Sequence, residues 1–366
     1  MTMKIGILTM HRVVNYGSAL QTYALQNFLN EKGFESEIID FVFTNKPHGL
    51  KNWLRYLVKC NFICAIKFRK FWNENYILSK KCYKTKDELS DASCKYDIYL
   101  TGSDQVWNPN HNGDELTFMF DFIKSPTAIK ISYASSFSAS VVPQCMEKKY
   151  SKLLTQYSTI SVREEKAVGL IKRLTGKDAA WVCDPTLLID KEIWQKLAQR
   201  AKLTIKGPYV LFYILTYAYN PYPEIEHIIK QIQEKYKGYR FVFLNGKVSD
   251  KRRHNSIVIN NISPYEFISL IENTEFVVTT SFHGTAFAIN FRKPFYSIIQ
   301  SNLLLDDRMY SLLHRLGLDN RAVCYDKELK FEEMKYDSEV EKLIYEFIHT
   351  SQKVLFESLK SKFIHI

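Results

Sequence analysis

The sequence predicts an α/β fold built from two parallel-sheet domains, and three observations support this class. The 366 residues suffice for two domains of about 150 residues each. Apolar residues make up 46% and charged residues 24%, which excludes disordered, collagen-like or solenoid chains. Short apolar runs alternate with polar loops and helical patterns, which is typical of β-α-β units with right-handed crossovers.

The first domain is predicted over residues 1–190. An apolar run at 5–10 predicts a buried strand, and Ser18 is the expected cap of a helix that ends near Gly33. A helical pattern at 52–72 interrupts the sheet. The other expected strands are 38–41, 96–100, 129–133 and 159–162, with a further β-α unit around 181–185.

The second domain is predicted over residues 205–335, beginning at Gly207-Pro208. A capping box at 263–266 opens one helix, and two more are expected at 222–236 and 284–291. Its expected strands are 209–215, 241–244, 257–259, 276–280 and 294–299. Residues 338–362 are expected to form a long amphipathic helix. Because ligands of such sheets bind beyond the carboxyl ends of the strands, we expect the two sheets to face a cleft.

The net charge of +11 comes from one segment. Residues 46–86 hold eleven Lys or Arg and a single acid, Glu74, whereas the rest of the chain is almost neutral. Interleaved aromatic residues favour a membrane-surface role for this basic insert, with a solvated face and a nucleic-acid patch as the alternatives. A uniformly basic nucleic-acid binder would not show this distribution, so we expect no nucleic-acid partner.

The seven cysteines are odd in number and form no CxxC pair, so we expect reduced thiols and no zinc site. The chain begins directly with a predicted strand and shows no signal-peptide pattern. No apolar run approaches the length of a membrane span. These features predict a cytoplasmic protein, peripheral at the inner face of the plasma membrane if the basic insert binds lipid.

Two polar motifs follow predicted strands of the first domain. Asn15-Tyr16-Gly17-Ser18 opens a helix, where free N–H groups favour an anion, although a simple capped helix explains it equally well. Residues 101–109 form a dense polar cluster in which Asp104 could act as a base toward a hydroxyl or bind a sugar. The alternative is a turn in which Asp104 caps backbone N–H groups.

Arginine and histidine supply the remaining candidates. Arg163 follows the strand at 159–162 and could bind a carboxylate or phosphate, or form a structural ion pair with Glu164 or Glu165. His283 stands between a β-branched strand and the start of a helix, a position that suits proton transfer beside an anion. The alternative is a structural histidine. Arg308 is a second possible anion ligand, or a partner of the neighbouring aspartates.

In this order the motifs resemble those of the polysaccharide pyruvyl transferase family, in the branch that begins with N-Y-G-S/A-x-L-Q. That element is residues 15–21 here. The other matching motifs are Gly-Ser-Asp-Gln-Val-Trp-Asn-Pro at 102–109, Ser-Val-Arg-Glu at 161–164, Asp-Pro-Thr at 184–186 and Ser-Phe-His-Gly-Thr at 281–285. The resemblance covers roughly residues 4–320.

The resemblance implies a GT-B-like fold with two Rossmann-like domains. It implies that phosphoenolpyruvate is the donor and that a cell-surface glycan, or its lipid-linked precursor, is the acceptor. The product would be a pyruvate ketal bridging two sugar hydroxyls. No metal or other cofactor is expected, since cationic side chains can neutralise the donor.

The resemblance also suggests a role for each candidate. His283 is the expected general acid, and Asp104 the acceptor-side base, the latter argued from chemistry more than from the family. The expected donor-binding residues are Arg163, Arg308, Ser281, Gly284 and Thr285. The expected acceptor-binding residues are Asn15, Tyr16, Gly17, Ser18, Ser103, Gln105 and Trp107.

One departure and two alternatives stay open. Some branches of the family have a basic residue two positions before the histidine, where this chain has Ser281. The first alternative is a GT-B glycosyltransferase that uses a nucleotide sugar. The second is a non-catalytic protein that binds a membrane surface through residues 46–86.

Overall fold

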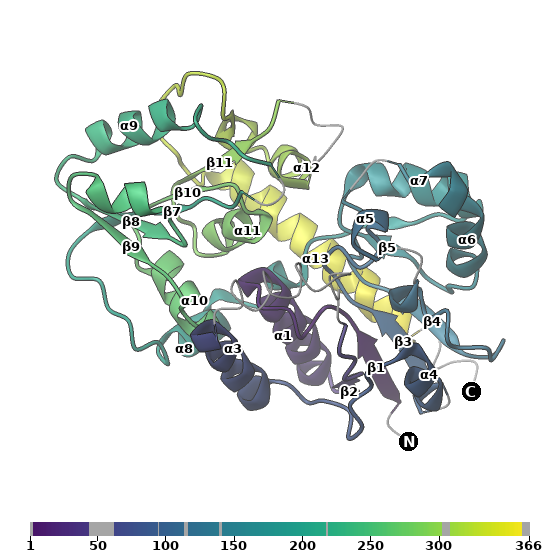
Figure 1. Cartoon of the computed structure of the whole chain (residues 1–366). Coiled ribbons are helices and arrows are strands. Elements are labelled where there is room, and N and C mark those ends of the chain that lie inside the picture. Colours follow the sequence, from purple (N-terminus) through teal and green to yellow (C-terminus); the bar gives the residue numbers. More distant parts are fainter. Residues whose placement is uncertain are drawn as a thin grey trace. The chain divides into compact units, whose positions relative to one another are not determined.

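The computed structural model describes residues 3–43, 62–93, 95–112, 116–138, 141–216, 219–301 and 308–360 (Figure 1). The chain divides into two compact units. Unit 1 comprises Met1–Ile189 and Phe347–Ile366, and unit 2 comprises Asp190–Glu346. The C-terminal helix α13 (Ser338–Lys360) does not form a part of its own, because its residues up to Glu346 belong to unit 2 and those from Phe347 to unit 1.

Unit 1 contains a parallel sheet with the strand order β2-β1-β3-β4. A short parallel pair continues it, since single bridges join Thr159 to Ile131 and Val162 to Ser135. The strands of the main sheet are β1 (Lys4–Leu8), β2 (Glu35–Ile38), β3 (Ile98–Thr101) and β4 (Ile129–Ser132). The pair consists of β5 (Ser161–Val162) and β6 (Ala180–Trp181).

Strand β2 begins three residues before the predicted 38–41. Its register starts with Glu35 opposite Lys4, and burial alternates along the strand with Ser36 and Ile38 buried. An edge strand needs only one buried face, so its polar residues concealed its beginning in the sequence. The backbone stays extended past Ile38, and the Ile39 N–H donates to the Ile7 carbonyl at 2.8 Å.

Helices flank this sheet. Helix α1 starts at Tyr16, and its cap is Asn15, whose Oδ1 accepts the Ser18 N–H at 3.2 Å; the predicted cap, Ser18, is therefore wrong. The predicted helix at 52–72 is described only from Phe62, because residues 44–61 lie outside the described part. The helices are α1 (Tyr16–Glu31), α3 (Phe62–Asn75), α4 (Lys86–Leu89), α5 (Pro109–Asn112), α6 (Gln144–Leu154) and α7 (Glu165–Thr175).

Unit 2 contains a second parallel sheet, with the order β12-β11-β10-β7-β8-β9. Its strands are β7 (Tyr209–Tyr213), β8 (Arg240–Leu244), β9 (Ser256–Ile259), β10 (Phe276–Thr279), β11 (Phe295–Ile299) and β12 (Ala322–Cys324). Its helices are α8 (Lys191–Ala198), α9 (Glu226–Lys235), α10 (Pro264–Glu272), α11 (Phe282–Asn290) and α12 (Arg308–Arg315).

Unit 2 begins earlier than Gly207-Pro208 because α8 packs within it. The Trp194 ring of α8 lies 4.8 Å from the Phe287 ring of α11, and α8 also contacts α10. The predicted capping box is present: Ser263 accepts the Glu266 N–H, and Glu266 accepts the Ser263 N–H. Aromatic side chains such as Phe212, Phe243 and Tyr296 fill the core on one side of the sheet.

Candidate functional site

Polar side chains follow strand after strand at the carboxyl edge of the unit 1 sheet. Thr9 comes after β1, Ser103 and Asp104 after β3, and Ser135 and Ser136 after β4. The same edge continues with Arg163 and Glu164 after β5 and Asp184 after β6. Because all these strands are parallel, their carboxyl ends meet at one edge, where open α/β sheets bind ligands.

The structure brings the motifs at 15–18 and 102–109 together through Ser18 and Asp104. The Ser18 hydroxyl donates to Asp104 Oδ2, and the Gln105 N–H donates to Asp104 Oδ1 at 2.8 Å. Asp104 has a φ of 76°, a left-handed conformation that costs a non-glycine residue about 1–2 kcal/mol. The local structure thus holds this carboxylate in one fixed orientation beside the start of α1.

The switch point of the unit 1 sheet lies between β1 and β3, since β2 pairs on one side of β1 and β3 on the other. Here the Thr9 hydroxyl donates to the Ser103 carbonyl at 2.9 Å. A Cβ on Gly102 would come within 2.9 Å of the Thr9 Cβ, so this position requires glycine for the close approach of the two strand ends. Ser103 itself is buried and donates to Asp184 Oδ2 at 3.0 Å.

Arg163 lies in a buried ion pair. Its Nη1 donates to Asp184 Oδ2 at 2.9 Å, and the two side chains are 1% and 0% exposed. Glu164 is a more distant partner, 3.7 Å from Arg163 Nε, and accepts the Ser136 hydroxyl. The sequence left open a structural pair with Glu164 or Glu165, but it gave no sign that Asp184 is the nearer partner. Binding of the donor by Arg163 stays a prediction.

A second charged cluster at this edge was not predicted. Arg12 donates to Asp40 through Nε and, at 2.6 Å, through Nη2, while the fully buried His11 places Nε2 3.0 Å from Asp40 Oδ1. Burial alone would raise the pKa of Asp40, but the hydrogen bonds from Arg12 and His11 outweigh it and hold the pKa well below its ordinary value. The sequence does hold a signal for this cluster, because Arg12 follows the first strand and Asp40 follows the second, at neighbouring strand ends.

Two predicted acceptor residues lie in the core instead. Trp107 is 0% exposed, and its ring lies 5.3 Å from Phe137 and 5.7 Å from Tyr157. Tyr16 is 4% exposed and packs on Phe68 of α3 at 5.3 Å. Both side chains pack beneath the edge of the sheet and do not line its surface. The sequence could not distinguish these two roles, because an aromatic residue within a polar motif is compatible with either. Gly17 is also buried, whereas Asn15 and Gln105 are partly exposed.

In unit 2, His283 lies at the switch point of the sheet. Strand β7 pairs with β8 on one side and with β10 on the other, and the motif at 281–285 follows β10 directly. Helix α11 begins at Phe282, and its cap is Ser281, whose Oγ accepts the Gly284 N–H at 3.3 Å. His283 is therefore the second residue of the helix, which begins two residues before the predicted start at Gly284.

Hydroxyl groups fix this strand-to-helix turn. Thr279 Oγ1 donates to the Tyr213 carbonyl at 2.8 Å and accepts the Ser281 N–H at 3.0 Å, while Thr280 Oγ1 bonds both backbone groups of Leu215. A Cβ on Gly284 would approach Thr279 Oγ1 to 2.5 Å, so the close packing of this turn requires glycine. Thr285 is fully buried, and its hydroxyl forms a hydrogen bond with Ser297 Oγ at 2.6 Å.

His283 is 8% exposed, and its ring packs edge-on against Phe282 at 5.3 Å. The first turn of α11 contains no acidic residue, so the positive end of the helix dipole stays uncompensated on the helix itself. Arg308 is the first residue of α12, which contacts α11 and β11. This end of unit 2 therefore combines a helix N-terminus, an imidazole and a nearby helix that begins with a guanidinium.

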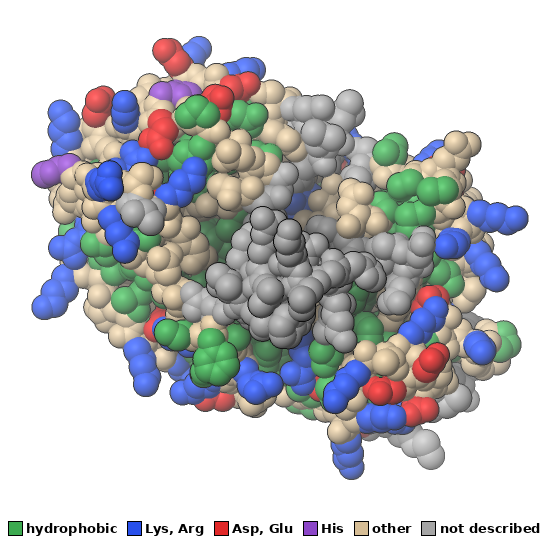
Figure 2. Space-filling model, viewed as in Figure 1, with side chains coloured by type: hydrophobic (Ala, Val, Ile, Leu, Met, Phe, Trp, Pro, Cys, Tyr) green, Lys and Arg blue, Asp and Glu red, His purple; other side chains and the backbone are tan. Residues whose placement is uncertain are grey.

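The site residues are distributed over both units. Asp104, Ser18 and Arg163 belong to unit 1, and His283, Ser281, Gly284, Thr285 and Arg308 belong to unit 2. In the described part of the chain, no group of three or more His, Cys, Asp or Glu side chains could hold a metal ion. On the face shown in Figure 2, Lys and Arg side chains are spread over the surface among Asp and Glu rather than gathered in one patch.

The family model for polysaccharide pyruvyl transferases matches residues 15–302, more than three quarters of the chain. The chain belongs to the polysaccharide pyruvyl transferase family. The matched range spans the polar edges of both units, from the Asn15 cap to beyond the His283 motif. A search of curated proteins found no match.

Solved structures share the fold. UDP-GlcNAc 2-epimerase from Methanocaldococcus jannaschii is 12% identical with a TM-score of 0.55, covering 95% of this chain and 93% of that one. The Neisseria meningitidis enzyme bound to UDP-GlcNAc is 11% identical with a TM-score of 0.55, covering 98% and 99%. UDP-N-acetylglucosamine 2-epimerase from Rickettsia bellii is 9% identical with a TM-score of 0.55, covering 99% of this chain and 97% of that one. These likenesses confirm the predicted GT-B-like class and show the fold alone.

Proposed function

We propose that this member of the family transfers pyruvate from phosphoenolpyruvate to two hydroxyls of one sugar in a cell-surface polysaccharide or its lipid-linked precursor. The product is a pyruvate ketal, and inorganic phosphate is released. The observation that supports this most is the place of His283, at the N-terminus of α11 and at the switch point of the unit 2 sheet, within the family match.

The reaction needs a proton, an anion site and a base. Protonation of the donor's CH₂ carbon turns it into a methyl group and leaves positive charge at the adjacent carbon, where the first sugar hydroxyl adds. Phosphate then departs as the C–O bond to it breaks, and the second hydroxyl adds to close the ketal. One hydroxyl proton balances the proton given to the carbon, and the other leaves with the phosphate.

His283 suits the first step. As the second residue of α11 it lies beside the free N–H groups and positive dipole end of the helix, which favour a bound anion. An anionic donor next to the imidazole would favour its protonated form, which is the form that a general acid requires. Arg308 is the proposed second contact to the donor.

Asp104 suits the acceptor. Its carboxylate is oriented by Ser18 and the Gln105 N–H. A sugar hydroxyl that approaches this edge would therefore meet a carboxylate oxygen held in a fixed position to accept a hydrogen bond. We propose that Asp104 receives the hydroxyl proton, with Ser18, Asn15 and Gln105 binding the sugar. Arg163, which is paired with Asp184, stays the proposed unit 1 contact to the donor.

The test combines binding and turnover on the full chain. Thermal unfolding is measured with phosphoenolpyruvate, UDP and UDP-sugars, where a ligand at 100 times its dissociation constant stabilises by about 2.7 kcal/mol. Phosphate release and ketal formation are then followed with candidate acceptor oligosaccharides. Stabilisation by phosphoenolpyruvate supports the proposal, whereas stabilisation by a UDP-sugar alone would favour the nucleotide-sugar glycosyltransferase.

We also propose that α3 contacts an anionic membrane surface, where a lipid-linked acceptor would lie. Its Phe68, Phe71 and Trp72 are buried, whereas Phe62, Ile63 and Ile66 are 76%, 58% and 53% exposed. Lys67, Arg69 and Lys70 lie on the same helix. Three further basic residues of the insert, Lys51, Arg55 and Lys59, lie outside the described residues. No described helix is both long and apolar enough to cross a membrane.

Vesicle sedimentation tests this contact. Each basic residue near an anionic surface contributes about 1 kcal/mol, so reversing Lys67 and Lys70 to Glu should weaken binding to phosphatidylglycerol vesicles about 30-fold or more. The matched control reverses Lys148 and Lys149 of α6, which are exposed and lie outside α3. Equal binding by both double variants would remove the membrane proposal, and binding without any turnover would favour the non-catalytic alternative.

A further inference from the structure

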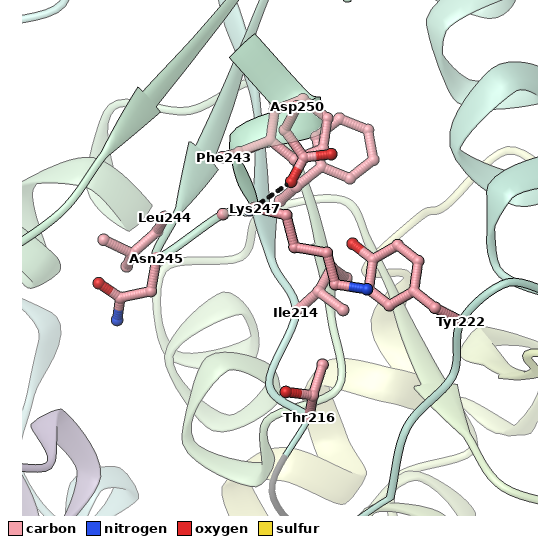
Figure 3. A pocket seen from close by; sticks show the side chains of 10 residues that line it. Ile214, Thr216, Tyr222, Phe243, Leu244, Asn245, Lys247 and Asp250 are labelled. Atoms are coloured by element: carbon pink, nitrogen blue, oxygen red, sulfur yellow. Dashed lines mark hydrogen bonds between the residues drawn. The ribbon is translucent and has the colours of Figure 1, made fainter. Parts of the chain in front are cut away.

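A small cavity opens at the carboxyl ends of β7 and β8 in unit 2, outside the motifs that the family resemblance identified (Figure 3). Its volume is about 60 Å³, the scale of a single small polyatomic group. The stacked rings of Phe212 and Phe243, 4.6 Å apart, form its apolar wall. The polar lining comes from Thr216, Tyr222, Asn245, Lys247 and Asp250.

The turn that carries Lys247 has a fixed shape. Asn245 has a φ of 54°, and a Cβ on Gly246 would come within 2.7 Å of the Phe243 Cβ. The Lys247 N–H donates to Asp250 Oδ2 at 2.7 Å, and Asp250 is 0% exposed. The other oxygen of Asp250 accepts Arg253 Nε at 2.9 Å. The carboxylate that lines the cavity is therefore already bonded to a backbone N–H and to another cation.

The Lys247 ammonium lies over an aromatic ring instead of beside an acid. Its Nζ is 3.1 Å from the centre of the Tyr222 ring, and Figure 3 shows it directed across the cavity toward that ring. Among the described residues, no carboxylate forms an ion pair with this ammonium. A ring face orients a cation without neutralising it, so the full positive charge remains available to a ligand.

A backbone contact of the residue before Thr216 links the cavity wall to the turn that carries His283. Thr216 follows Leu215, whose N–H donates to Thr280 Oγ1 at 2.7 Å, and Thr280 directly precedes the Ser281 cap. β8 is the second strand from β10, so their ends are about 10 Å apart at the usual spacing of parallel strands. A lysine side chain and a three-carbon phosphate ester together span that distance.

We propose that this cavity is an anion subsite of the donor, in which Lys247 and Thr216 bind the phosphate group of phosphoenolpyruvate and retain it as inorganic phosphate after transfer. The inference rests on the proposed function for the identity of the donor. The carboxylate of the donor then lies toward the N-terminus of α11 and His283. Lys247 thus supplies a cation at an end of the sheet where the motif itself has Ser281.

The test compares Lys247→Ala with Lys251→Ala, an exposed lysine of the following 3-10 helix (Val248–Arg252) that does not line the cavity. Calorimetry measures the binding of phosphoenolpyruvate and, separately, of inorganic phosphate to the full chain. Loss of a charge-assisted contact should weaken both about 10- to 100-fold in Lys247→Ala and leave both unchanged in Lys251→Ala. Turnover should show a raised KM for the donor with a smaller change in kcat.

The outcomes separate the two proposals. Wild-type binding of phosphoenolpyruvate that Lys247→Ala leaves intact overturns the subsite and spares the proposed function. Phosphate binding that depends on Lys247, without any binding of phosphoenolpyruvate, supports the anion site and overturns the proposed donor. Tyr222→Leu, which removes the ring under the ammonium, should weaken phosphate binding in the same direction, and unchanged binding in that variant would contradict the role of the ring.

Discussion

The polar and charged side chains at the carboxyl edges of the two sheets have different kinds of partners. In unit 1, Arg163 is paired with Asp184 and Arg12 with Asp40, and both pairs are largely withdrawn from water. In unit 2, the hydroxyls of Thr279, Thr280 and Ser281 bond backbone groups, and the Lys247 ammonium rests on a ring. One edge pairs its charges internally, and the other combines a helix N-terminus that has no acidic residue in its first turn with the Lys247 ammonium.

This difference suggests a division of labour. A neutralised, hydrogen-bonded edge offers fixed acceptors such as Asp104, which suit the hydroxyls of an uncharged sugar. An edge with helix N–H groups and a cation that has no acidic partner among the described residues suits a substrate with two negative groups. The variants below weaken one edge at a time, so each effect can be assigned to one unit.

The largest expected effect is on turnover, at the unit 2 edge. His283→Ala should lower kcat about 1,000-fold, the usual scale for loss of a general acid, with a much smaller change in donor affinity. Steady-state kinetics with phosphoenolpyruvate measures both. His254→Ala, a change at an exposed histidine, is the matched control and should behave like the wild type. Near-normal turnover in His283→Ala would assign proton transfer to another group.

The next effect is on stability, at the unit 1 edge. Asp184→Asn removes the carboxylate 2.9 Å from Arg163, and the loss of this charged partner for a buried guanidinium should cost about 3–5 kcal/mol. Urea unfolding measures the change. Glu147→Gln breaks the exposed pair with Arg173, whose side chains are 50% and 33% exposed, and should cost less than about 1 kcal/mol. Equal costs would mean that burial of the pair contributes nothing.

The Arg12–Asp40 pair allows a pH test. Asp40→Asn should cost about 2–3 kcal/mol at neutral pH, less than Asp184→Asn because Arg12 is 25% exposed and the amide still accepts one hydrogen bond. Burial raises the pKa of Asp40, but the bonds from Arg12 and His11 lower it further, so the net shift is downward. A lowered folded pKa means that the stabilisation is complete above the unfolded pKa, about 4, and is lost as the pH falls below it.

Unfolding free energies at several pH values check this sign. The difference between wild type and Asp40→Asn should stay constant from neutral pH down to about pH 5 and shrink at lower pH. A difference that grows as the pH falls would show that the pKa of Asp40 is raised, and would remove the proposed role of Arg12 and His11 in holding the carboxylate ionised.

Much of the fold could be predicted because its strands are short, apolar and followed by polar loops. The sheet of unit 2 appears within a residue or two of the predicted strands, apart from the short β12, and the Ser263–Glu266 capping box was read directly from its spacing. Strand β2 was misplaced because only one of its faces is buried, and helix α8 was not predicted as part of unit 2 because its partners α10 and α11 lie far along the chain.

The site was predictable in position and less so in detail. The motifs at 102–109, 161–164 and 281–285 lie at the ends of β3, β5 and β10, as expected, since a polar run after an apolar one is a local signal. Which side chains then meet depends on the order of strands in the sheet. The Arg163–Asp184 pair, the Arg12–Asp40–His11 cluster and the burial of Trp107 follow from that order, and residues tens of positions apart carry no local sign of it.

The smallest effect compares one substitution at two glycines. In Gly284→Ala the new Cβ would lie 2.5 Å from Thr279 Oγ1, and the strand-to-helix turn beside His283 must shift, which should cost about 1–3 kcal/mol. In Gly169→Ala, on an exposed turn of α7 in unit 1, nothing lies within 4 Å, and better helix propensity should stabilise by up to about 1 kcal/mol. Urea unfolding should therefore give changes in the free energy of unfolding of opposite sign for the two variants.

The same pair of variants also tests turnover. Because the shift at Gly284 moves His283 relative to the end of β10, Gly284→Ala should also lower kcat, whereas Gly169→Ala should leave it unchanged. A destabilised Gly284→Ala with full turnover would show that catalysis tolerates movement at this turn, and the fixed geometry of the unit 2 edge would then serve stability alone.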